Sequence, residues 1–171
     1  MTAFTRYLSA ASRILLTIGV LAIGLMMLHV TADVASKLLL SQPLIGTLET
    51  VSLFYMVAIV FLPLAVVQRD RQQVFIELFT QKMPPRPRAI LDILALMLSL
   101  TFCVLLTWKG LETALEKTHV RELSTNIEFQ VEVWPGRWLP VVGYGATGLW
   151  CLIQIIEDIR IIVTGADHVE S

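Results

Sequence analysis

Charged residues are scarce in this chain of 171 residues: 16% of them are charged, whereas 56% are hydrophobic. This composition excludes an ordinary soluble domain and predicts one integral membrane unit. The formal net charge of −1 provides no basic field for nucleic acid, and no basic stripe interleaved with aromatic residues occurs. We therefore expect no nucleic-acid partner.

Metal-binding and redox residues are also few, with two cysteines and three histidines. Cys103 and Cys151 lie inside apolar runs, form no CxxC motif and are interpreted as packing residues. A bis-histidine haem needs two histidines on facing helices, but only His29 lies in an apolar run, and we interpret it as a hydrogen-bonded residue near a helix end. The sequence predicts no catalytic residue, no metal ligand and no cofactor-binding residue.

What the chain does have is four long apolar runs. At about 1.5 Å per residue, each is long enough to cross the roughly 30 Å hydrocarbon layer of a bilayer as a helix. A secretory signal peptide is the alternative for the first run, but that run is too long for one. We predict an all-α integral membrane protein, a single membrane domain over residues 1–171 with spans at about 14–34, 50–68, 89–109 and 138–157.

Charged and cap-forming residues mark the ends of the first two spans. Asp33 and Lys37 stand at i and i+4, where they stabilise a helix end or are simply solvated there. Thr47 is the expected N-cap of the second span, and Glu49 falls in its first turn, where the helix dipole favours an anion. Pro63 cannot donate a backbone hydrogen bond, so we expect the second helix to bend there.

The segment between the second and third spans is too short and too polar to cross a membrane. Residues 72–82 place Phe75 and Phe79 on one face and polar residues mostly opposite, which predicts a short amphipathic interfacial helix. Three prolines, Pro84, Pro85 and Pro87, are expected to end that helix and to form a tight turn into the third span.

The approach to the fourth span has a different pattern. Residues 127–133 alternate apolar and polar side chains, which predicts an extended segment that rests on the helices or on a partner. Trp134 and Trp138 follow it as interfacial aromatics, and Trp108 ends the third run. Within the fourth span, small side chains share one face and let another helix approach closely. These are Gly143, Ala146 and Thr147.

The distribution of basic residues predicts the orientation. With four spans, eight Lys and Arg residues fall on the side of the termini and the middle loop, and five fall on the other side. The positive-inside rule then places both termini and the middle loop in the cytoplasm (N-in/C-in). The larger set is Arg6, Arg13, Arg69, Arg71, Lys82, Arg86, Arg88 and Arg160, and the smaller set is Lys37, Lys109, Lys117, Arg121 and Arg137.

None of the four spans has a charged residue at its middle. A self-sufficient secondary transporter usually shows such residues or broken helices at the midplane, and often inverted repeats. The residues themselves therefore indicate a protein that contributes membrane mass and surfaces, while the transport or catalytic site lies elsewhere.

The order of these features resembles the small membrane subunit of tripartite ATP-independent periplasmic (TRAP) transporters, the DctQ-like family. The resemblance covers nearly the whole chain. It rests on Asp33-Val34, on residues 43–49, on Arg69 to Leu78 and on the Ser124 to Pro140 approach to the fourth span. Two positions differ from residues frequent in that family, namely Lys37 in place of Arg and Gln73 in place of His.

The resemblance implies a scaffold without a substrate site of its own. The partners it implies are a large M-type membrane subunit that carries sodium and an organic acid, a periplasmic binding protein that delivers the acid, and membrane lipids. The implied location is the bacterial inner membrane, with sodium bound only at the partner subunit and with room for structural lipids.

Three groups of residues are candidates for these contacts. For the interface with the large subunit they are Asp33, Lys37, Glu49, Arg69, Arg71, Gly143 and Thr147. For anchoring in the membrane interface they are Trp108, Trp134, Trp138, Phe75 and Phe79, and for docking of the binding protein they are Glu128, Glu132 and Arg137.

Two other functions fit the same apolar pattern. One is a four-helix membrane anchor of a redox complex, which a Soret band in the absorption spectrum would reveal. The other is a small autonomous exporter, against which the missing midplane carboxylate argues.

Overall fold

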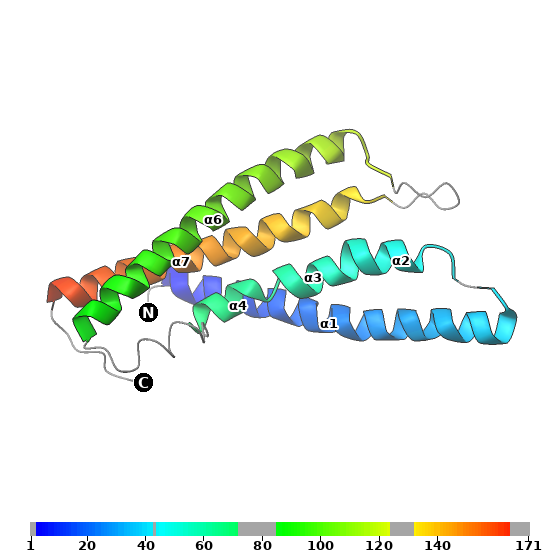
Figure 1. Ribbon diagram of the computed structural model, residues 1–171, viewed down its shortest axis with the longest axis horizontal. Helices are drawn as coiled ribbons and strands as arrows, with labels where there is room; N and C mark the ends of the chain where they lie inside the picture. The colour runs from blue at the N-terminus through cyan, green and yellow to red at the C-terminus, as the bar shows by residue number, and fades with distance from the viewer. Residues whose placement is uncertain (1–2, 43, 72–84, 124–131, 165–171) are drawn as a thin grey trace.

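The computed structural model describes residues 3–42, 44–71, 85–123 and 132–164 (Figure 1). Across these ranges the regular elements are helices, and four segments are long and apolar enough to cross a membrane. They are Phe4–Leu40, Thr47–Arg69, Ile90–His119 and Trp134–Arg160. The predicted all-α fold with four spans is confirmed, while the predicted interfacial helix at 72–82 lies outside the described residues.

The helices extend well beyond the apolar runs that indicated them. Helix α1 runs over Ala3–Leu40 and α6 over Pro85–His119, with 38 and 35 residues. At 1.5 Å per residue, α1 is about 57 Å long, nearly twice the hydrocarbon thickness. Helix α7, Trp138–Thr164, follows a single 3₁₀ turn, η2, at Trp134–Arg137. The predicted spans therefore cover only the middle of α1 and α6.

The predicted proline turn before the third span is wrong in part. Helix α6 begins at Pro85 and continues through Pro87, so these two prolines lie inside the helix and not in a turn. The first turn of a helix has backbone N–H groups without intrahelical partners, so the missing N–H of proline removes no hydrogen bond there.

The second span is the most irregular of the four. It consists of α2 (Thr47–Thr50), a π-helical turn η1 (Val51–Tyr55), α3 (Met56–Phe61) and α4 (Leu64–Arg69). The helix is interrupted between Phe61 and Leu64, where Pro63 lacks the N–H that would bond to Ile59. The expected bend at Pro63 is confirmed.

The spans pack as a row of two hairpins. Helix α1 packs against the second span, α6 packs against α7, and α7 lies against α3 and α4 (Figure 1). The second span and α7 run in the same direction. We call the end where α1 begins and α7 ends the termini end, and the opposite end, with residues 41–42, 44–46 and 120–123, the turn end.

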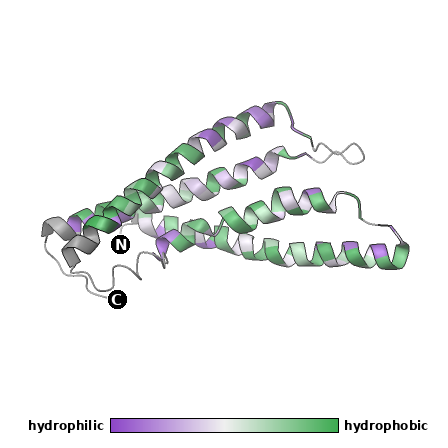
Figure 2. Ribbon diagram, viewed as in Figure 1, coloured by the Kyte–Doolittle hydropathy of each residue, from purple (hydrophilic) through white to green (hydrophobic). Residues whose placement is uncertain are grey.

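This arrangement buries little apolar surface. In the most apolar stretch of each span, 39% of the residues are buried in the fourth, 22% in the second and 11% in the first and third. Ala22, Ala58 and Leu62 form a small core between α1 and the second span. Hydrophobic residues cover the middle of the helices in Figure 2 and hydrophilic ones gather toward their ends. Helix α7 is therefore the central element, while α1 and α6 expose apolar faces suited to lipid or to another membrane protein.

Candidate functional site

The line of contact between η2–α7 and the second span, which we call the α7 seam, holds the two hairpins together. Toward the turn end the seam is built from glycines. A Cβ added to Gly143 would overlap the carbonyl oxygen of Phe61, and one added to Gly136 would lie 2.5 Å from the carbonyl oxygen of Leu53. Leu53 lies in the π-helical turn and Phe61 at the break before Pro63, so each glycine faces an irregular point of the second span. Only a residue without a side chain allows the backbones to approach this closely.

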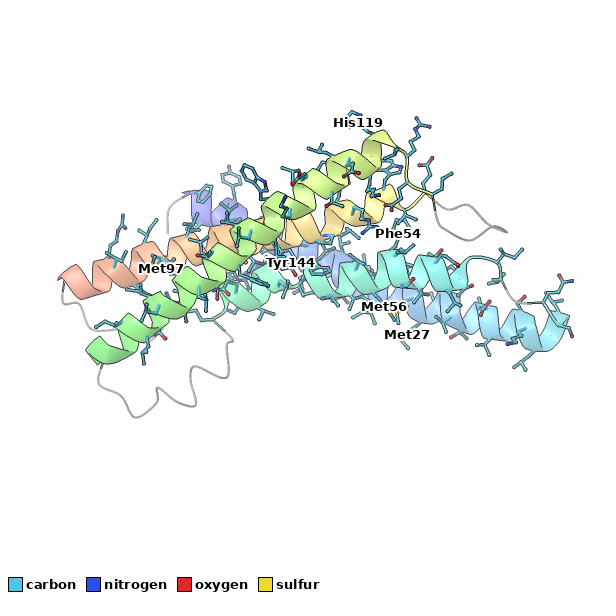
Figure 3. The ribbon with its side chains drawn as sticks, turned by 45° about the horizontal axis from the view of Figure 1, so that its top comes forward. Met27, Phe54, Met56, Met97, His119 and Tyr144 are labelled. Carbon is cyan, nitrogen blue, oxygen red and sulfur yellow. The ribbon has the colours of Figure 1, made fainter. Side chains whose placement is uncertain are left out.

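A glycine also allows α1 to approach the second span closely. A Cβ at Gly19 would lie 3.2 Å from the ring of Pro63. The break in the second span is therefore held between Gly19 of α1 on one side and Gly143 of α7 on the other. Tyr144, in the second turn of α7 (Figure 3), packs edge-on against Phe61 with ring centroids 5.1 Å apart.

Toward the termini end the seam becomes polar. The side chain of Gln68 donates to Gln154 Oε1 at 2.7 Å, and Gln154 Nε2 donates in return to the backbone oxygen of Gln68 at 2.7 Å. Both residues are buried. Since α4 ends at Arg69, the carbonyl of Gln68 belongs to the last turn of a helix, where backbone acceptors lack intrahelical partners. The backbone N–H of Arg71 bonds to the same oxygen at 3.1 Å, and Gln154 adds a second hydrogen bond to the end of α4 from the neighbouring helix.

A bidentate ion pair follows one turn further along α7. Arg71 Nη2 donates to Asp158 Oδ1 at 2.7 Å and Arg71 Nη1 to Oδ2 at 3.2 Å. The Asp158 side chain is 3% exposed and that of Arg71 is 39% exposed. Arg71 has a φ of 49°, a left-handed conformation that favours glycine after a helix, yet an arginine stands there and reaches α7. A buried carboxylate of this kind needs its partner.

The polar half of the seam also reaches α1. Trp150 Nε1 donates to Ser12 Oγ at 2.8 Å, and Ser12 Oγ donates to the backbone oxygen of Leu8 at 2.9 Å. Arg69 Nη1 donates to Ser9 Oγ at 3.2 Å. Trp150, Gln154 and Asp158 lie four residues apart, on one face of α7. Three helices are therefore joined by hydrogen bonds at this end.

The sequence analysis missed most of this polar cluster. It singled out Arg69, Arg71, Gly143 and Thr147, but not Gln68, Gln154, Asp158, Ser12 or Trp150. The four-residue spacing of Trp150, Gln154 and Asp158, continuous with the face of Gly143 and Thr147, is the signal that could have found them. Thr147 itself donates to the backbone oxygen of Gly143 at 2.8 Å, so its hydroxyl is satisfied within α7.

The remaining candidates for a partner interface lie at the turn end. Asp33 Oδ1 accepts from the backbone N–H of Leu44 at 2.7 Å and from Thr47 Oγ1 at 3.3 Å, so it closes the turn after α1 and does not pair with Lys37. Glu49 lies in the first turn of α2, as predicted. The predicted N-cap is off by one residue, because Gly46 takes the cap position with a φ of 86° and Thr47 starts the helix.

At the same end, short ion pairs connect α6 to η2. Arg137 Nε donates to Glu122 at 3.2 Å, and Lys117 lies 3.7 Å from Glu122. Trp134 Nε1 donates to Glu132 at 2.8 Å, and Leu123 pairs with Glu132 in an isolated antiparallel bridge. Of the predicted docking residues, Glu132 and Arg137 are thus brought near Glu122, whereas Glu128 lies outside the described residues, together with 127–131 of the predicted extended segment.

The predicted membrane anchors divide into two kinds. Trp108 is 70% exposed and lines an open apolar groove of about 210 Å³ between α6 and α7. Trp138 Nε1 donates to Thr118 Oγ1 at 3.2 Å. Phe75 and Phe79 lie outside the described residues. That these aromatic side chains lie in the membrane interface stays a prediction.

The described histidine and cysteine side chains do not come together in one site. His29 packs edge-on against Tyr55 with ring centroids 5.9 Å apart, a ring contact where we expected a hydrogen bond, and His119 lies at the turn end of α6 (Figure 3). Cys103 and Cys151 are buried free thiols. In the part of the chain that the structure describes, no group of three His, Cys, Asp or Glu side chains could hold a metal ion.

The four segments that are long and apolar enough to cross a membrane indicate a multi-pass membrane protein, and among the described residues every buried side-chain nitrogen or oxygen has a hydrogen-bond partner. Residues 26–161 match the family model described as "Tripartite ATP-independent periplasmic transporters, DctQ component". The match covers well over half of the chain, and the chain belongs to this family, the small membrane component of TRAP transporters. The chain matches no curated protein and no solved structure.

Proposed function

We propose that this chain is the scaffold subunit of a sodium-coupled TRAP transporter that takes up an organic acid. In this proposal a large M-type subunit binds sodium and the acid, and a periplasmic binding protein delivers the acid. The chain itself braces the large subunit, catalyses no reaction and binds no cofactor. Membership of the DctQ family supports the tripartite assembly.

The polar half of the α7 seam is the observation that carries the scaffold role. Among the described residues, no buried side-chain nitrogen or oxygen lacks a hydrogen-bond partner. The amides of Gln68 and Gln154 and the Arg71–Asp158 pair are each used to hold one helix to another. A protein that carries a charged solute needs polar groups that are available to that solute. The polar groups of this seam are used for rigidity instead.

The exposed faces support a partner within the membrane. Helices α1 and α6 have the least buried apolar stretches. We propose that part of this surface contacts the large subunit and that the rest contacts lipid, with Asp33, Lys37 and Glu49 at the edge of the contact. The surface of Glu132 and Arg137 at the turn end is proposed to face the binding protein.

The fold and the distribution of basic residues support an orientation in the membrane. The first turns of α1 and the last turns of α4 and α7 lie at the termini end, the side to which the excess of basic residues belongs. We propose that this end faces the cytoplasm of the bacterial inner membrane, which places the turn end in the periplasm, where a binding protein can reach it.

Reconstitution tests the scaffold role. Liposomes that contain this chain alone, the large subunit alone or both are given a sodium gradient, the binding protein and a labelled organic acid. We expect uptake only when both membrane subunits are present. Uptake by this chain alone would disprove the proposal, and so would full uptake by the large subunit alone. Affinity purification of the tagged chain in mild detergent should recover the large subunit in equal amount.

A further inference from the structure

A group of arginines gathers around Ser9 at the termini end. Arg6, Ser9 and Arg13 stand at i, i+3 and i+7 of α1 and so share one face. Arg69 reaches this face from the end of α4, where its Nη1 donates to Ser9 Oγ at 3.2 Å. We call Arg6, Ser9, Arg13 and Arg69, together with Asp70, the arginine cluster.

The charges of the cluster do not cancel. Asp70 accepts from Arg69 Nε at 2.6 Å and from Arg69 Nη2 at 3.1 Å, so its carboxylate is matched to that one guanidinium. Arg13 is close enough to act on Asp70 electrostatically, but no hydrogen bond or ion pair to a described residue holds it. Arg6 and Arg13 are both exposed. The cluster therefore presents the positive charge of two arginines.

The position of the cluster at the membrane boundary indicates which kind of anion it would bind. Arg13 directly precedes the apolar run that begins at Ile14, so it stands where the polar boundary of a bilayer meets the hydrocarbon. From this point the face of Arg6 and Arg13 continues along α1 with the exposed apolar side chains of Val20 and Met27, which are 57% and 64% exposed. A molecule with a phosphate at one end and a long apolar chain at the other matches both features, whereas inorganic phosphate matches only the first.

We infer that the arginine cluster binds the headgroup phosphate of an anionic phospholipid, whose acyl chain lies along the face of Val20 and Met27. Arginine binds phosphate through several N–H groups in a planar arrangement, and basic residues at a membrane boundary attract anionic lipids. Bound there, the lipid covers the junction between α1 and α4. The inference rests on the membrane location of the chain and not on the proposed transport role.

Thermal unfolding of the full chain in detergent micelles tests this inference. Phosphatidylglycerol, phosphatidylcholine or inorganic phosphate is added to separate samples. Because a ligand that binds the folded state raises Tm, we expect phosphatidylglycerol to raise it by about 5 °C more than phosphatidylcholine does. The double variant Arg6→Gln/Arg13→Gln should lose this difference. The matched control Lys109→Gln/Arg160→Gln removes the same charge outside the cluster and should keep it.

Each other outcome overturns the inference. An equal response of the wild-type chain to both lipids would exclude a site for anionic lipid, and retention of the difference by the double variant would place the site elsewhere. Loss of the difference in the control would reduce the effect to net charge, and an equal rise with inorganic phosphate would exclude the role of the acyl chain. Native mass spectrometry of phosphatidylglycerol adducts gives a second readout if a variant unfolds early. None of these results depends on whether the large subunit co-purifies.

Discussion

The two halves of the α7 seam hold the same pair of helices together by different means. Toward the turn end, Gly136 and Gly143 bring α7 into direct contact with backbone carbonyls of the second span. Toward the termini end, Gln154 and Asp158 bridge the two helices with side chains. In lipid there is no hydrophobic drive for helices to associate, so close packing and hydrogen bonds are the available sources of attraction. This seam uses one of them in each half.

The difference between Asp158 and Gly143 follows their positions relative to the ends of the apolar runs. Asp158 and Arg71 come after the uncharged runs, near the polar boundary, where a charged pair costs less than at the bilayer centre. Gly143 faces the break before Pro63, inside the second span, where a charge would be costly. The comparison indicates that the glycine half is destabilised when a side-chain atom is added, whereas the polar half is destabilised when a hydrogen-bonding partner is removed.

The largest effect is expected from adding one methyl group to the glycine half. Gly143→Ala places a Cβ onto the carbonyl oxygen of Phe61, which as backbone cannot move aside. We expect a loss of about 2 to 3 kcal/mol in the free energy of unfolding, measured by chemical unfolding in detergent micelles. The matched control is Gly24→Ala, because a Cβ there meets no atom within 4 Å. It should stay within about 0.5 kcal/mol of the wild-type chain or stabilise it. Equal losses in both variants would refute the role of close approach.

The next effect is expected in the polar half. Arg71→Ala leaves the buried Asp158 carboxylate without its guanidinium and should cost about 2 kcal/mol, below the range for fully buried pairs because Arg71 is partly exposed. Arg71→Gly loses the same pair but relieves the φ of 49°, so its cost should be smaller by about 1 kcal/mol. A double-mutant cycle with Asp158→Ala measures the coupling. Equal costs for alanine and glycine would show that the left-handed backbone stores no strain.

The spans and the proline break could be predicted because each depends on local sequence. An apolar run of membrane length must become a helix, and Pro63 must interrupt one, whatever surrounds it. Glu49 was placed in the first turn for the same reason. The cap was misplaced by one residue because the choice between Gly46 and Thr47 depends on a φ of 86°, which the pattern of residue types does not contain.

The polar half of the seam could not be predicted because it is not local. Gln68 and Gln154 are 86 positions apart, and Arg71 and Asp158 are 87 positions apart. In sequence each looks like an ordinary polar residue near a membrane boundary. They become partners only because α7 runs parallel to the second span, in a register set by the two glycine contacts.

A smaller effect is expected from the paired amides. Gln154→Leu removes the side-chain bond to Gln68 and the cap on the last carbonyls of α4. Hydrogen bonds between membrane helices contribute little individually, so the expected cost is about 1 kcal/mol. The double variant Gln68→Leu/Gln154→Leu should recover part of it, because two apolar side chains then replace one unmatched amide. If the double variant were instead as costly as the sum of the single variants, the two amides would be acting independently of each other.

The smallest effect is expected at Asp70, outside the seam. The hydrogen bond from Arg69, helped by the charges of Arg69 and Arg13, lowers the pKa of Asp70 below its ordinary value. A carboxylate with a lowered pKa in the folded state stabilises the fold above its unfolded pKa, and this stabilisation is lost only as the pH falls through the lower, folded value. Lowering the pH from 7 to 5 should therefore leave this contribution intact.

Because Asp70 is over a third exposed, solvent screens the pair, and Asp70→Asn should change Tm only slightly at pH 7. The wild-type chain and the variant should differ in stability at low pH. The wild-type chain should lose stability more steeply than the Asp70→Asn variant once the pH falls below the usual range of an aspartate. Coincident acid limbs for the two proteins would mean that the Arg69–Asp70 pair adds nothing to the stability of the fold.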